Sequence, residues 1–179
     1  MFIYPFVDQY ATTSPSQFSI HDNELFTSGQ SGAGVLIQDN TAPLPPFIDA
    51  AIWNNSIQLQ NSLSEGIPVY NTKGTKIWNN SITGSDEIDA IALYSSTLGT
   101  VISNSVSGVT LDSTAGVAQI LLDPGTSKDL VVCSNPSNTV LNQGTNNLVV
   151  NCDPGAMTAS ANGDALSQPL ISRFHKLSP

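Results

Sequence analysis

The sequence has little charge, and most of that charge is negative. Charged residues make up 11% of the 179 residues, and five Lys and Arg stand against fourteen Asp and Glu, for a formal net charge of −9. A surface of this sign repels the phosphates of a nucleic acid or of an anionic bilayer. Nucleic acid is therefore excluded as an expected partner.

Long apolar runs are missing as well. The longest largely apolar segments, such as residues 48–53 and 117–122, are far shorter than the roughly 20 residues of a membrane-spanning helix, so no membrane span is expected. Residues 1–8 also lack the positive flank and the long apolar stretch of a secretory signal. Either export is signalled elsewhere or the chain is a piece of a longer one, and we expect the second.

Residues that favour helices on protein surfaces are scarce too. Ser, Thr, Asn and Gly are plentiful where a helical protein would carry Glu and Lys. These side chains disfavour helix interiors and suit turns, bends and strands. A single domain of β structure with many turns is the expected class for a chain of this length.

What the sequence does contain is an internal repeat. The hexapeptide IWNNSI at residues 52–57 returns at residues 77–82, an offset of 25, and as VISNSV at residues 101–106, a further offset of 24. A looser copy, IHDNEL, lies 32 residues before the first, at residues 20–25. A second apolar segment, at residues 67–69, has counterparts 32 before and 24 after. Two separate apolar segments that recur at nearly the same offsets indicate a stack of coils of roughly 24 residues.

Each repeat reads as two strands joined by a bend. Apolar residues alternate with others at residues 67–69 and 91–93, which is the period of a strand with one buried face. Ile52 and Ile57 are five residues apart, so both can face inward only if the chain bends between them. Asn55 is the expected bend residue, because Asn tolerates left-handed backbone angles. Its amide can also bond the same amide in the next coil, which predicts a ladder of Asn23, Asn55, Asn80 and Asn104.

This apolar-x-Asn-Asn-Ser-apolar motif resembles the repeat of the right-handed parallel β-helix, or pectin-lyase-like, proteins. The resemblance covers residues 18–111 well. It continues more loosely, since DLVV at residues 129–132 returns as NLVV at residues 147–150, with Ser134 and Cys152 in the ladder positions. It implies an all-β fold, a right-handed parallel β-helix (solenoid) of about five to seven coils.

The resemblance also implies how the chain is divided. Residues 1–155 would form the coils, with further coils upstream if the chain is a fragment. Residues 156–179 would form a C-terminal capping tail, because an end coil exposes unpaired backbone and apolar core. The Pro-rich residues 40–49 would leave the stack as a loop, since proline cannot join a central strand ladder.

Cysteine is rare, with only Cys133 and Cys152 in the chain. Two cysteines do not define a disulfide framework or a metal site by themselves. They are either two small buried side chains or, because an offset of 18 puts them on neighbouring coils, a disulfide formed in an oxidising compartment. The sequence leaves both readings open.

Acidic turns carry the best candidate for catalysis. Asp86, Glu87 and Asp89 precede the strand that begins at residue 91, and the 24-residue offset puts Asp89 directly above Glu65. Coils about 4.8 Å apart would bring these carboxylates close enough to raise one pKa, to recruit calcium, or to act as the acid pair of a glycoside hydrolase. The alternative is a solvated acidic turn. No cofactor besides calcium is expected.

Lys73 is the basic candidate near these acids, because a lyase or epimerase needs a base beside the sugar carboxylate. Together with Lys76 it flanks the loop before residue 77, where the alternative is a pair of solubilising charges. The repeat region contains no Arg, which weakens the case for cleavage of an anionic polysaccharide.

Trp53 and Trp78 are the candidate substrate-binding residues. The offset of 25 stacks them, and strand alternation turns both indoles outward. They would then form a platform for sugar rings or a patch that docks another protein. The alternative is that a loop covers them.

Together these features predict a carbohydrate-associated protein that binds or processes a polysaccharide or surface glycan, at the cell surface or outside the cell. The family it resembles includes polysaccharide lyases, epimerases, glycoside hydrolases, tailspikes and adhesins, so the fold does not select a reaction. An enzyme would belong to one of the first three groups, and the alternative is a non-catalytic structural or adhesin-type module. Convergence of Glu65, Asp86, Asp89 and Lys73 with the tryptophans would favour an enzyme, and scatter would favour the module.

Overall fold

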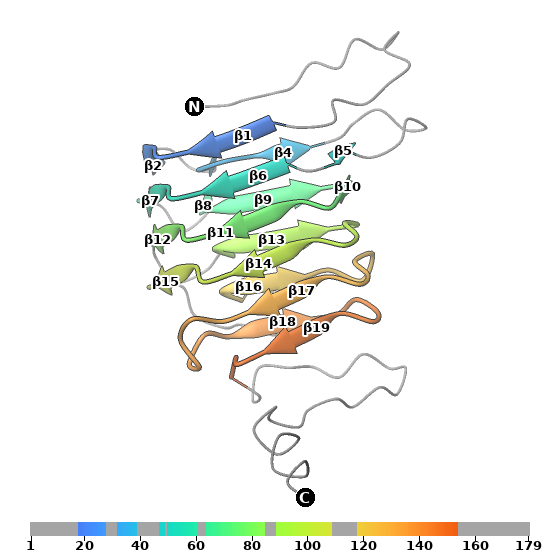
Figure 1. Cartoon of the computed structure of the whole chain (residues 1–179). Coiled ribbons are helices and arrows are strands. Elements are labelled where there is room, and N and C mark those ends of the chain that lie inside the picture. Colours follow the sequence, from blue (N-terminus) through green and yellow to red (C-terminus); the bar gives the residue numbers. More distant parts are fainter. Residues whose placement is uncertain are drawn as a thin grey trace, which may run out of the picture.

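The computed structural model describes residues 18–27, 32–38, 47–48, 50–60, 64–84, 89–108 and 118–153. Within these ranges every regular element is a strand, and every pairing of two strands is parallel. The strands lie one above another in a column (Figure 1). The fold class predicted from the repeats, an all-β parallel β-helix, is confirmed.

The largest sheet takes one strand from each coil. In the described part of the chain it has six strands, in line with the expected five to seven coils. Their order is β1 (Phe18–His21), β6 (Ala50–Trp53), β11 (Lys76–Trp78), β14 (Thr100–Ile102), β17 (Leu130–Val132) and β19 (Leu148–Val150).

Two further sheets complete the walls of the column, counted over the described ranges. One has five strands, in the order β4 (Ile37–Gln38), β9 (Ile67–Tyr70), β13 (Ile91–Tyr94), β16 (Ile120–Leu122) and β18 (Val140–Asn142). The other has four, in the order β2 (Glu24–Thr27), β7 (Ser56–Leu59), β12 (Ser81–Thr83) and β15 (Ser105–Ser107). Two short pairs of strands lie in the connections between these sheets. They are β3 (Gly32–Ala33) with β8 (Ser64–Glu65), and β5 (Phe47–Ile48) with β10 (Thr72–Lys73).

One coil runs from β6 through β7, β8, β9 and β10 to β11, which then pairs with β6. This pairing aligns Ile52 with Ile77 at the offset of 25 seen in the sequence. The β9–β13 pairing aligns Ile67 with Ile91 at the offset of 24. The sequence repeat therefore predicts the strand register correctly.

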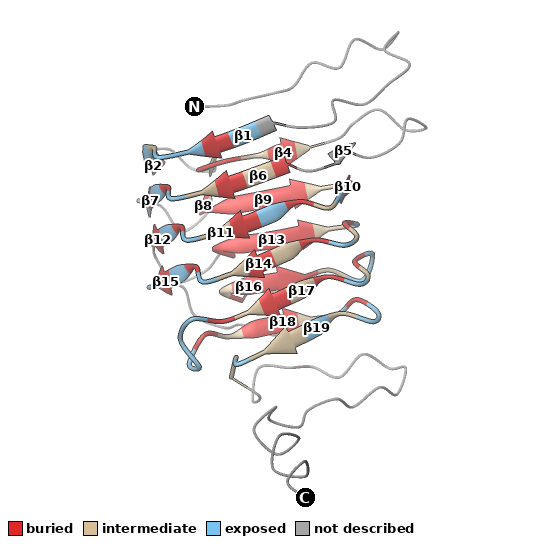
Figure 2. Ribbon diagram, viewed as in Figure 1, coloured by how far each residue is buried: buried red, intermediate tan, exposed pale blue. Residues whose placement is uncertain are grey.

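The strands that wall the column carry its buried residues (Figure 2), and branched aliphatic side chains fill the interior. They occupy alternate strand positions, so each coil places its apolar residues against those of the next coil. Full burial of one such side chain contributes about 1.5–3 kcal/mol. Both Ile52 and Ile57 are buried, as the bend between them requires. The largest fully buried members of this interior are Ile37, Ile52, Ile57, Ile67, Val69, Ile77, Ile82, Ile91, Leu93 and Leu122.

The bend between β6 and β7 is made by Asn54, not by Asn55 as expected from the sequence. Asn54 has a φ of 54°, and its counterparts Asp22, Asn79 and Ser103 have φ values of 56°, 53° and 56°. A left-handed conformation brings Cβ close to the backbone, a strain that Asn and Asp tolerate better than most residues. The side chain of Asn54 is exposed, while that of Asn55 is buried. Asn54 therefore makes the bend, and its neighbour Asn55 is left to form the ladder.

The residue after each bend turns its amide into the column. Nδ2 of Asn23 donates to Oδ1 of Asn55 over 2.9 Å, Asn55 donates to Asn80 over 2.9 Å, and Asn80 donates to Asn104 over 3.0 Å. The backbone N–H of each upper residue donates to the same oxygen. The asparagine ladder is thus present, and its amides all donate in one direction along the column.

The lower coils are smaller than the upper ones. β17 pairs with β19 at an offset of 18, with Val131 aligned to Val149. Within the described residues the four-stranded sheet has no strand below β15. Ser134 takes the ladder position below Asn104, and its Oγ donates to the Asn104 carbonyl over 2.8 Å. A hydroxyl-to-backbone bond therefore replaces the amide rung there.

Part of the segment 40–49 belongs to the stack. Phe47 and Ile48 form β5 and pair with Thr72 and Lys73. The expectation that the whole segment leaves the stack is wrong at this end, because its prolines, which cannot donate to a ladder, all precede Phe47. The rest of the segment and the expected capping tail at residues 156–179 lie outside the described residues.

Candidate functional site

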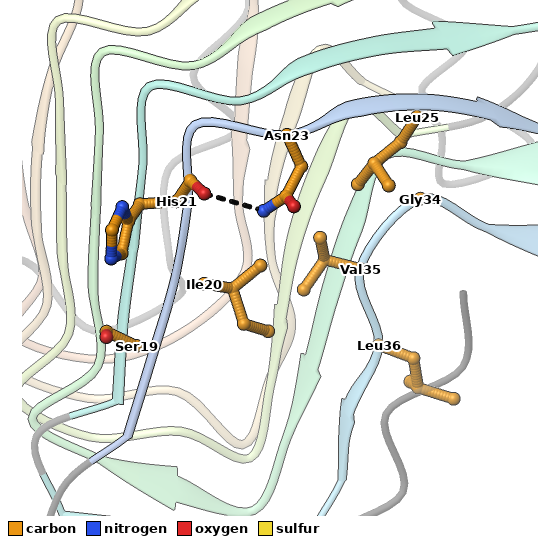
Figure 3. A pocket seen from close by; sticks show the side chains of 8 residues that line it. All are labelled: Ser19, Ile20, His21, Asn23, Leu25, Gly34, Val35 and Leu36. Atoms are coloured by element: carbon orange, nitrogen blue, oxygen red, sulfur yellow. Dashed lines mark hydrogen bonds between the residues drawn. The ribbon is translucent and has the colours of Figure 1, made fainter.

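A row of aromatic rings stands on the outer face of the six-stranded sheet. His21, Trp53 and Trp78 are aligned in register at the ends of β1, β6 and β11. Each follows a buried residue, such as Ile20 or Ile52, and strand alternation therefore turns the ring outward. Figure 3 shows Ile20 and His21 on opposite sides of β1. We call His21, Trp53 and Trp78 the aromatic row.

The rings of the aromatic row stack face to face. The ring centroids of His21 and Trp53 are 4.2 Å apart with 10° between the planes, and those of Trp53 and Trp78 are 4.9 Å apart with 7°. The coil spacing of about 4.8 Å sets this separation. Because neighbouring rings cover each other's faces, the two partly exposed indoles present edges to solvent. The expected stacking of Trp53 and Trp78 is thus present, and their role as a platform for sugar rings stays a prediction.

Apolar side chains continue the row down the same face. Ile102, Val132 and Val150 follow Trp78 in register on β14, β17 and β19. All three are partly exposed. The stack of rings thus ends at Trp78, which is followed by an aliphatic side chain instead of another ring.

Glu65 and Asp89 meet on neighbouring coils, as the 24-residue offset predicts. The backbone bond between the residue after Glu65, Gly66, and the Asp89 carbonyl fixes this alignment. Tyr94, at the end of β13, donates its hydroxyl to Glu65 Oε1 over 2.8 Å. Tyr70 stacks on Tyr94 with 4.4 Å between ring centroids. We call Glu65, Asp89, Tyr70 and Tyr94 the acid–tyrosine cluster.

Burial controls the protonation of the acid–tyrosine cluster. It raises the pKa of Asp89 to about 7, with the Glu65 carboxylate adding to the rise and the Ala118 N–H opposing it. Burial also raises the pKa of Glu65, against the hydrogen bond from Tyr94. Close carboxylates of this kind exchange protons as a coupled pair. The pair therefore has the electrostatic character of an acid–base site.

Access to the pair is poor, however. Asp89 is only 5% exposed, and its Oδ1 accepts the Ala118 N–H on the next coil over 2.7 Å. Of the predicted catalytic carboxylates, the structure brings together Glu65 and Asp89, whereas Asp86 lies outside the described residues, as does Glu87. Among the described residues, the pair links neighbouring coils through the hydrogen bonds from Ala118 to Asp89 and from Tyr94 to Glu65.

Lys73 does not join the acid–tyrosine cluster. Glu65 precedes β9, and Lys73 follows β9 in β10, at the other end of that strand. Its side chain is exposed, and its backbone is paired with Ile48 and Thr97. Lys73 therefore does not supply a base beside Glu65 for lyase or epimerase chemistry.

The aromatic row and the acid–tyrosine cluster belong to different walls of the column. The row lies on the six-stranded sheet, and the cluster lies at the ends of β9 and β13 in the five-stranded sheet. The acids therefore do not converge with the tryptophans. Among the residues that the structure describes, no group of three or more His, Cys, Asp or Glu could hold a metal ion.

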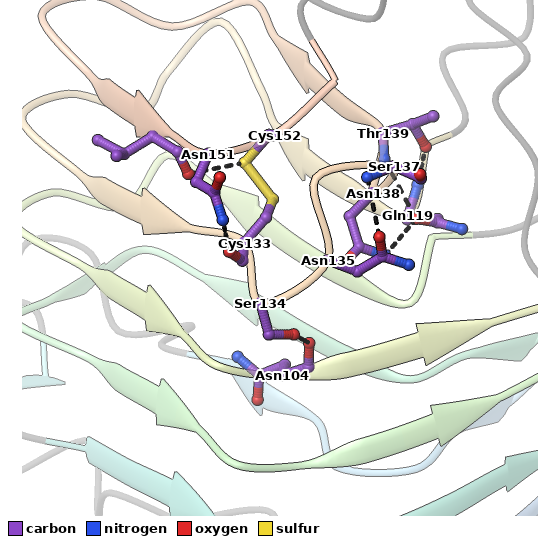
Figure 4. The surroundings of a disulfide bond; sticks show 11 residues. Asn104, Gln119, Cys133, Ser134, Asn135, Ser137, Asn138, Thr139, Asn151 and Cys152 are labelled. Atoms are coloured by element: carbon purple, nitrogen blue, oxygen red, sulfur yellow. Dashed lines mark hydrogen bonds between the residues drawn. A yellow bond between two sulfur atoms is a disulfide. The ribbon is translucent and has the colours of Figure 1, made fainter. Parts of the chain in front are cut away.

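Cys133 and Cys152 form a disulfide, with 5.2 Å between their Cα atoms (Figure 4). It joins the coil of β17 to the coil of β19, so the covalent reading is correct. The Asn151 side chain reinforces the joint, since its Nδ2 donates to the Cys133 carbonyl over 2.9 Å. Cys152 thus occupies a ladder position but binds through sulfur instead of an amide.

Sequence reasoning missed the tyrosines and a second polar stack. Tyr70 and Tyr94 share the 24-residue offset, which was the available signal. At the corner after β9, Thr75 Oγ1 donates to Thr72 Oγ1 over 2.9 Å, and Thr72 donates to Ser96 Oγ over 3.2 Å. All three hydroxyl side chains are buried. Ser and Thr are so frequent in this chain that their alignment does not stand out from the sequence.

Comparison of the chain with protein-family models, with curated proteins and with solved structures finds no match in any of the three. The described residues include no helix long and apolar enough to cross a membrane. Function is therefore inferred from the aromatic row, the acid–tyrosine cluster and the disulfide.

Proposed function

We propose that the chain is a pectin-lyase-like β-helix module that binds a polysaccharide or surface glycan, outside the cell or at the cell surface. The observation that carries this proposal is the aromatic row on the outer face of the six-stranded sheet. The family part of the proposal is supported by the Asn-Asn motif and its ladder.

The aromatic row suits an extended sugar chain. An indole edge combines apolar carbon with an N–H donor, and a sugar presents both C–H groups and hydroxyls. Trp53 and Trp78 are spaced 4.9 Å along the column, so a glycan lying along the column meets one ring edge per coil.

Charge favours a neutral glycan over an acidic one. Lys76 is exposed on the same strand as Trp78, in the neighbouring outward column of side chains. The formal net charge of −9 nevertheless repels a polyanion at long range. The proposed ligand is therefore a neutral polysaccharide held by hydrogen bonds and apolar contacts.

The disulfide supports the proposed location. Cys133 and Cys152 are joined, and disulfides form and persist mainly in oxidising compartments such as the cell exterior. A glycan-binding module at the cell surface or outside the cell fits this chemistry.

Binding is favoured over cleavage. A glycoside hydrolase needs two accessible carboxyl groups on either side of the scissile bond. Asp89 is almost completely buried, and the acid–tyrosine cluster lies on a different sheet from the tryptophans. The raised pKa values of Glu65 and Asp89 keep processing of a polysaccharide as the second candidate.

The test is a glycan-array screen of the intact chain, with and without calcium, followed by product analysis on every polysaccharide that binds. Trp53→Ala and Trp78→Ala test the row, with circular dichroism to confirm that each variant is folded. Phe26→Ala is the matched control, because Phe26 is 56% exposed on a different sheet.

We expect binding that either tryptophan substitution weakens about tenfold, a loss of about 1.4 kcal/mol, while Phe26→Ala leaves it unchanged. Binding that is indifferent to both tryptophan substitutions would show that the row is not the site. Shortening of the bound polysaccharide that disappears in Glu65→Gln would establish the enzyme instead.

A further inference from the structure

A tripeptide that occurs in two bends of the column has a use that neither the fold nor the aromatic row explains. The sequence NNS, at residues 54–56 and again at residues 79–81, matches the acceptor motif for N-linked glycans, Asn-x-Ser without proline in the middle. No other segment of the sequence matches this motif or its Asn-x-Thr form. We call residues 54–56 and 79–81 the acceptor motifs.

The bend itself does not require an acceptor motif. Asp22 takes the bend position in the coil above residues 54–56, and Ser103 takes it in the coil below residues 79–81. Glu24 occupies the position of the motif serine in the first of these coils. Two coils thus make the same bend without the motif, which leaves it free for a further role in the other two.

The two bends present the first Asn of each acceptor motif to solvent. Asn54 and Asn79 have φ values of 54° and 53°, and both side chains are exposed. The Asn that follows each of them is buried in the ladder, so only the first amide of each motif is accessible. Ser56 and Ser81, which complete the motifs, are exposed too. The bends lie one above the other at one edge of the column (Figure 1).

The folded coil tolerates a glycan at either bend. The glycan is attached to Nδ2 of Asn54 or Asn79, whereas the ladder bonds of the same coils are made by Asn55 and Asn80. Asn54 also donates a hydrogen bond to the Asp22 carboxylate on the coil above. Because a modified amide nitrogen keeps one hydrogen, this bond can persist.

The disulfide supports exposure of the chain to the machinery that attaches such glycans. Cys133 and Cys152 are joined, and disulfides form in the oxidising secretory route, where Asn-linked glycans are also added. The inference therefore rests on the location proposed above, outside the cell or at its surface. It does not rest on glycan binding at the aromatic row.

We propose that Asn54 and Asn79 are acceptors for an N-linked oligosaccharide, transferred from a lipid pyrophosphate carrier by a membrane-bound transferase. Nδ2 of the Asn forms a bond to C1 of the first sugar and loses one proton. The bond between C1 and the pyrophosphate oxygen breaks, and the lipid pyrophosphate leaves with the electron pair.

Transfer takes place before the coils close on one another. In the folded chain the Ser56 N–H donates to the Asn23 carbonyl over 2.8 Å. The Ser81 N–H donates to the Asn55 carbonyl over the same distance. A transferase has to bind the backbone of the motif in place of these neighbours, so the newly made chain is the substrate and the folded chain is not.

The test synthesises the intact chain, behind a cleavable secretion signal, into microsomes that carry the transferase. Enzymatic release of N-linked glycans leaves an aspartate at each modified position, which peptide mass spectrometry locates. Asn54→Gln and Asn79→Gln remove the acceptors, and Ser56→Ala removes a motif hydroxyl while keeping its Asn. The matched control is Ser105→Ala, because Ser105 is exposed at the equivalent position of the coil that lacks the motif.

We expect a glycan at Asn54, at Asn79 or at both, lost from the altered motif in each variant and unchanged in Ser105→Ala. Ser103→Asn places the motif in the coil below and should add a glycan there. A chain without glycans at both Asn54 and Asn79 overturns the proposal. Because transfer precedes folding, these outcomes do not depend on whether a variant folds.

The chain recovered from its native cells must carry the same modification. Its absence there overturns the proposal whatever the microsomes show, because the chain then does not meet the transferase. Glycan binding at the aromatic row is measured on chain made without glycans, so that proposal and this one fail separately.

Discussion

The backbone N–H of Gly99 donates to Asp129 Oδ1 over 2.6 Å, while Asp129 Oδ2 lies buried without a hydrogen-bond partner in the described part of the chain. Asn147 occupies the same position one coil below, where its Oδ1 accepts from the Asp129 N–H and its Nδ2 donates to Thr126 Oγ1. By this alignment, Asp129 Oδ2 occupies the position that the donating Nδ2 group has in Asn147. The hydroxyl residue above Asn147 is Thr126, and its equivalent above Asp129 is Ser96. We infer that this oxygen carries a proton in the folded protein at acidic pH.

Asp129→Asn is predicted to remove a pH-dependent loss of stability. Burial raises the pKa of Asp129 to about 6, from 3.8, so the folded state favours the protonated form. The resulting stability is fully present below pH 4 and is lost as the pH rises to about 6. A shift of about two units corresponds to about 3 kcal/mol at 1.36 kcal/mol per unit. Chemical unfolding at pH 4 and pH 7 measures it.

The Asn variant should be more stable than the native chain at pH 7 and no more stable at pH 4. An equal effect at both pH values would show that Asp129 is not protonated in the folded state. The Asp123 carboxylate adds the smallest contribution to the rise in the pKa of Asp129, so Asp123→Asn serves as the second variant and should reduce the pH dependence only slightly.

Asp89→Asn is predicted to stabilise the chain above neutral pH. The pKa of Asp89 is raised to about 7, chiefly by burial, so its stabilising protonated form is lost as the pH rises from about 4 to about 7. Asn can still accept the Ala118 N–H and ends the repulsion between Asp89 and Glu65. Thermal unfolding at pH 8 should show a higher Tm for the variant, and the gain should vanish near pH 4.

Asn80→Leu is predicted to lower the stability by about 3 kcal/mol or more. Asn80 is 1% exposed, and its loss removes the acceptor of the Asn55 backbone N–H, one of the acceptors of the Asn55 side-chain amide, and the amide donor to the Ile52 carbonyl. Each buried polar group left unpaired costs about 1–3 kcal/mol. Denaturant unfolding measures the change, with Ser81→Ala as the control, because Ser81 is exposed. A loss no larger than that of the control would mean that the ladder contributes little to stability.

Reduction of the disulfide is predicted to destabilise the chain by roughly 3 kcal/mol, the chain-entropy value for a loop of this size. Cys133 and Cys152 are 19 residues apart in the sequence. Thermal unfolding with and without reductant measures the effect, and hydrogen exchange should rise first in β19 (Leu148–Val150). The double variant Cys133→Ala and Cys152→Ala should behave like the reduced chain and ignore the reductant. A response of the double variant would point to a different cause.

Repeat spacing predicts the pairing register because a parallel β-helix places equivalent residues of successive coils side by side. The offsets of 25 and 24 reproduce the pairing of Trp53 with Trp78 and of Ile67 with Ile91. The same alignment is enough to predict the amide ladder and to bring Glu65 next to Asp89. The sequence therefore predicts most of the interactions between equivalent residues of neighbouring coils.

The repeat spacing does not predict interactions that depend on the direction of a side chain. Tyr94 reaches back to Glu65, 29 residues earlier in the chain, and no single offset contains that contact. Asn54 and Asn55 recur together, so spacing cannot say which is left-handed and which forms the ladder. The face-to-face stacking of the indoles likewise follows from ring orientation, which strand alternation does not determine.

The disulfide also gives the column an uneven response to force. Tension applied to the chain beyond Cys152 passes through the sulfur bond to Cys133, so the bonds between β17 and β19 are bypassed. The first hydrogen bonds to be loaded are those that join β14 to β17. In the described residues no comparable link ties β1 to β6, and pulling before Phe18 peels that pair apart one bond after another. Tension at the Cys152 end thus separates β17 and β19 from β14 as one unit, whereas tension at the other end separates β1 from β6 alone.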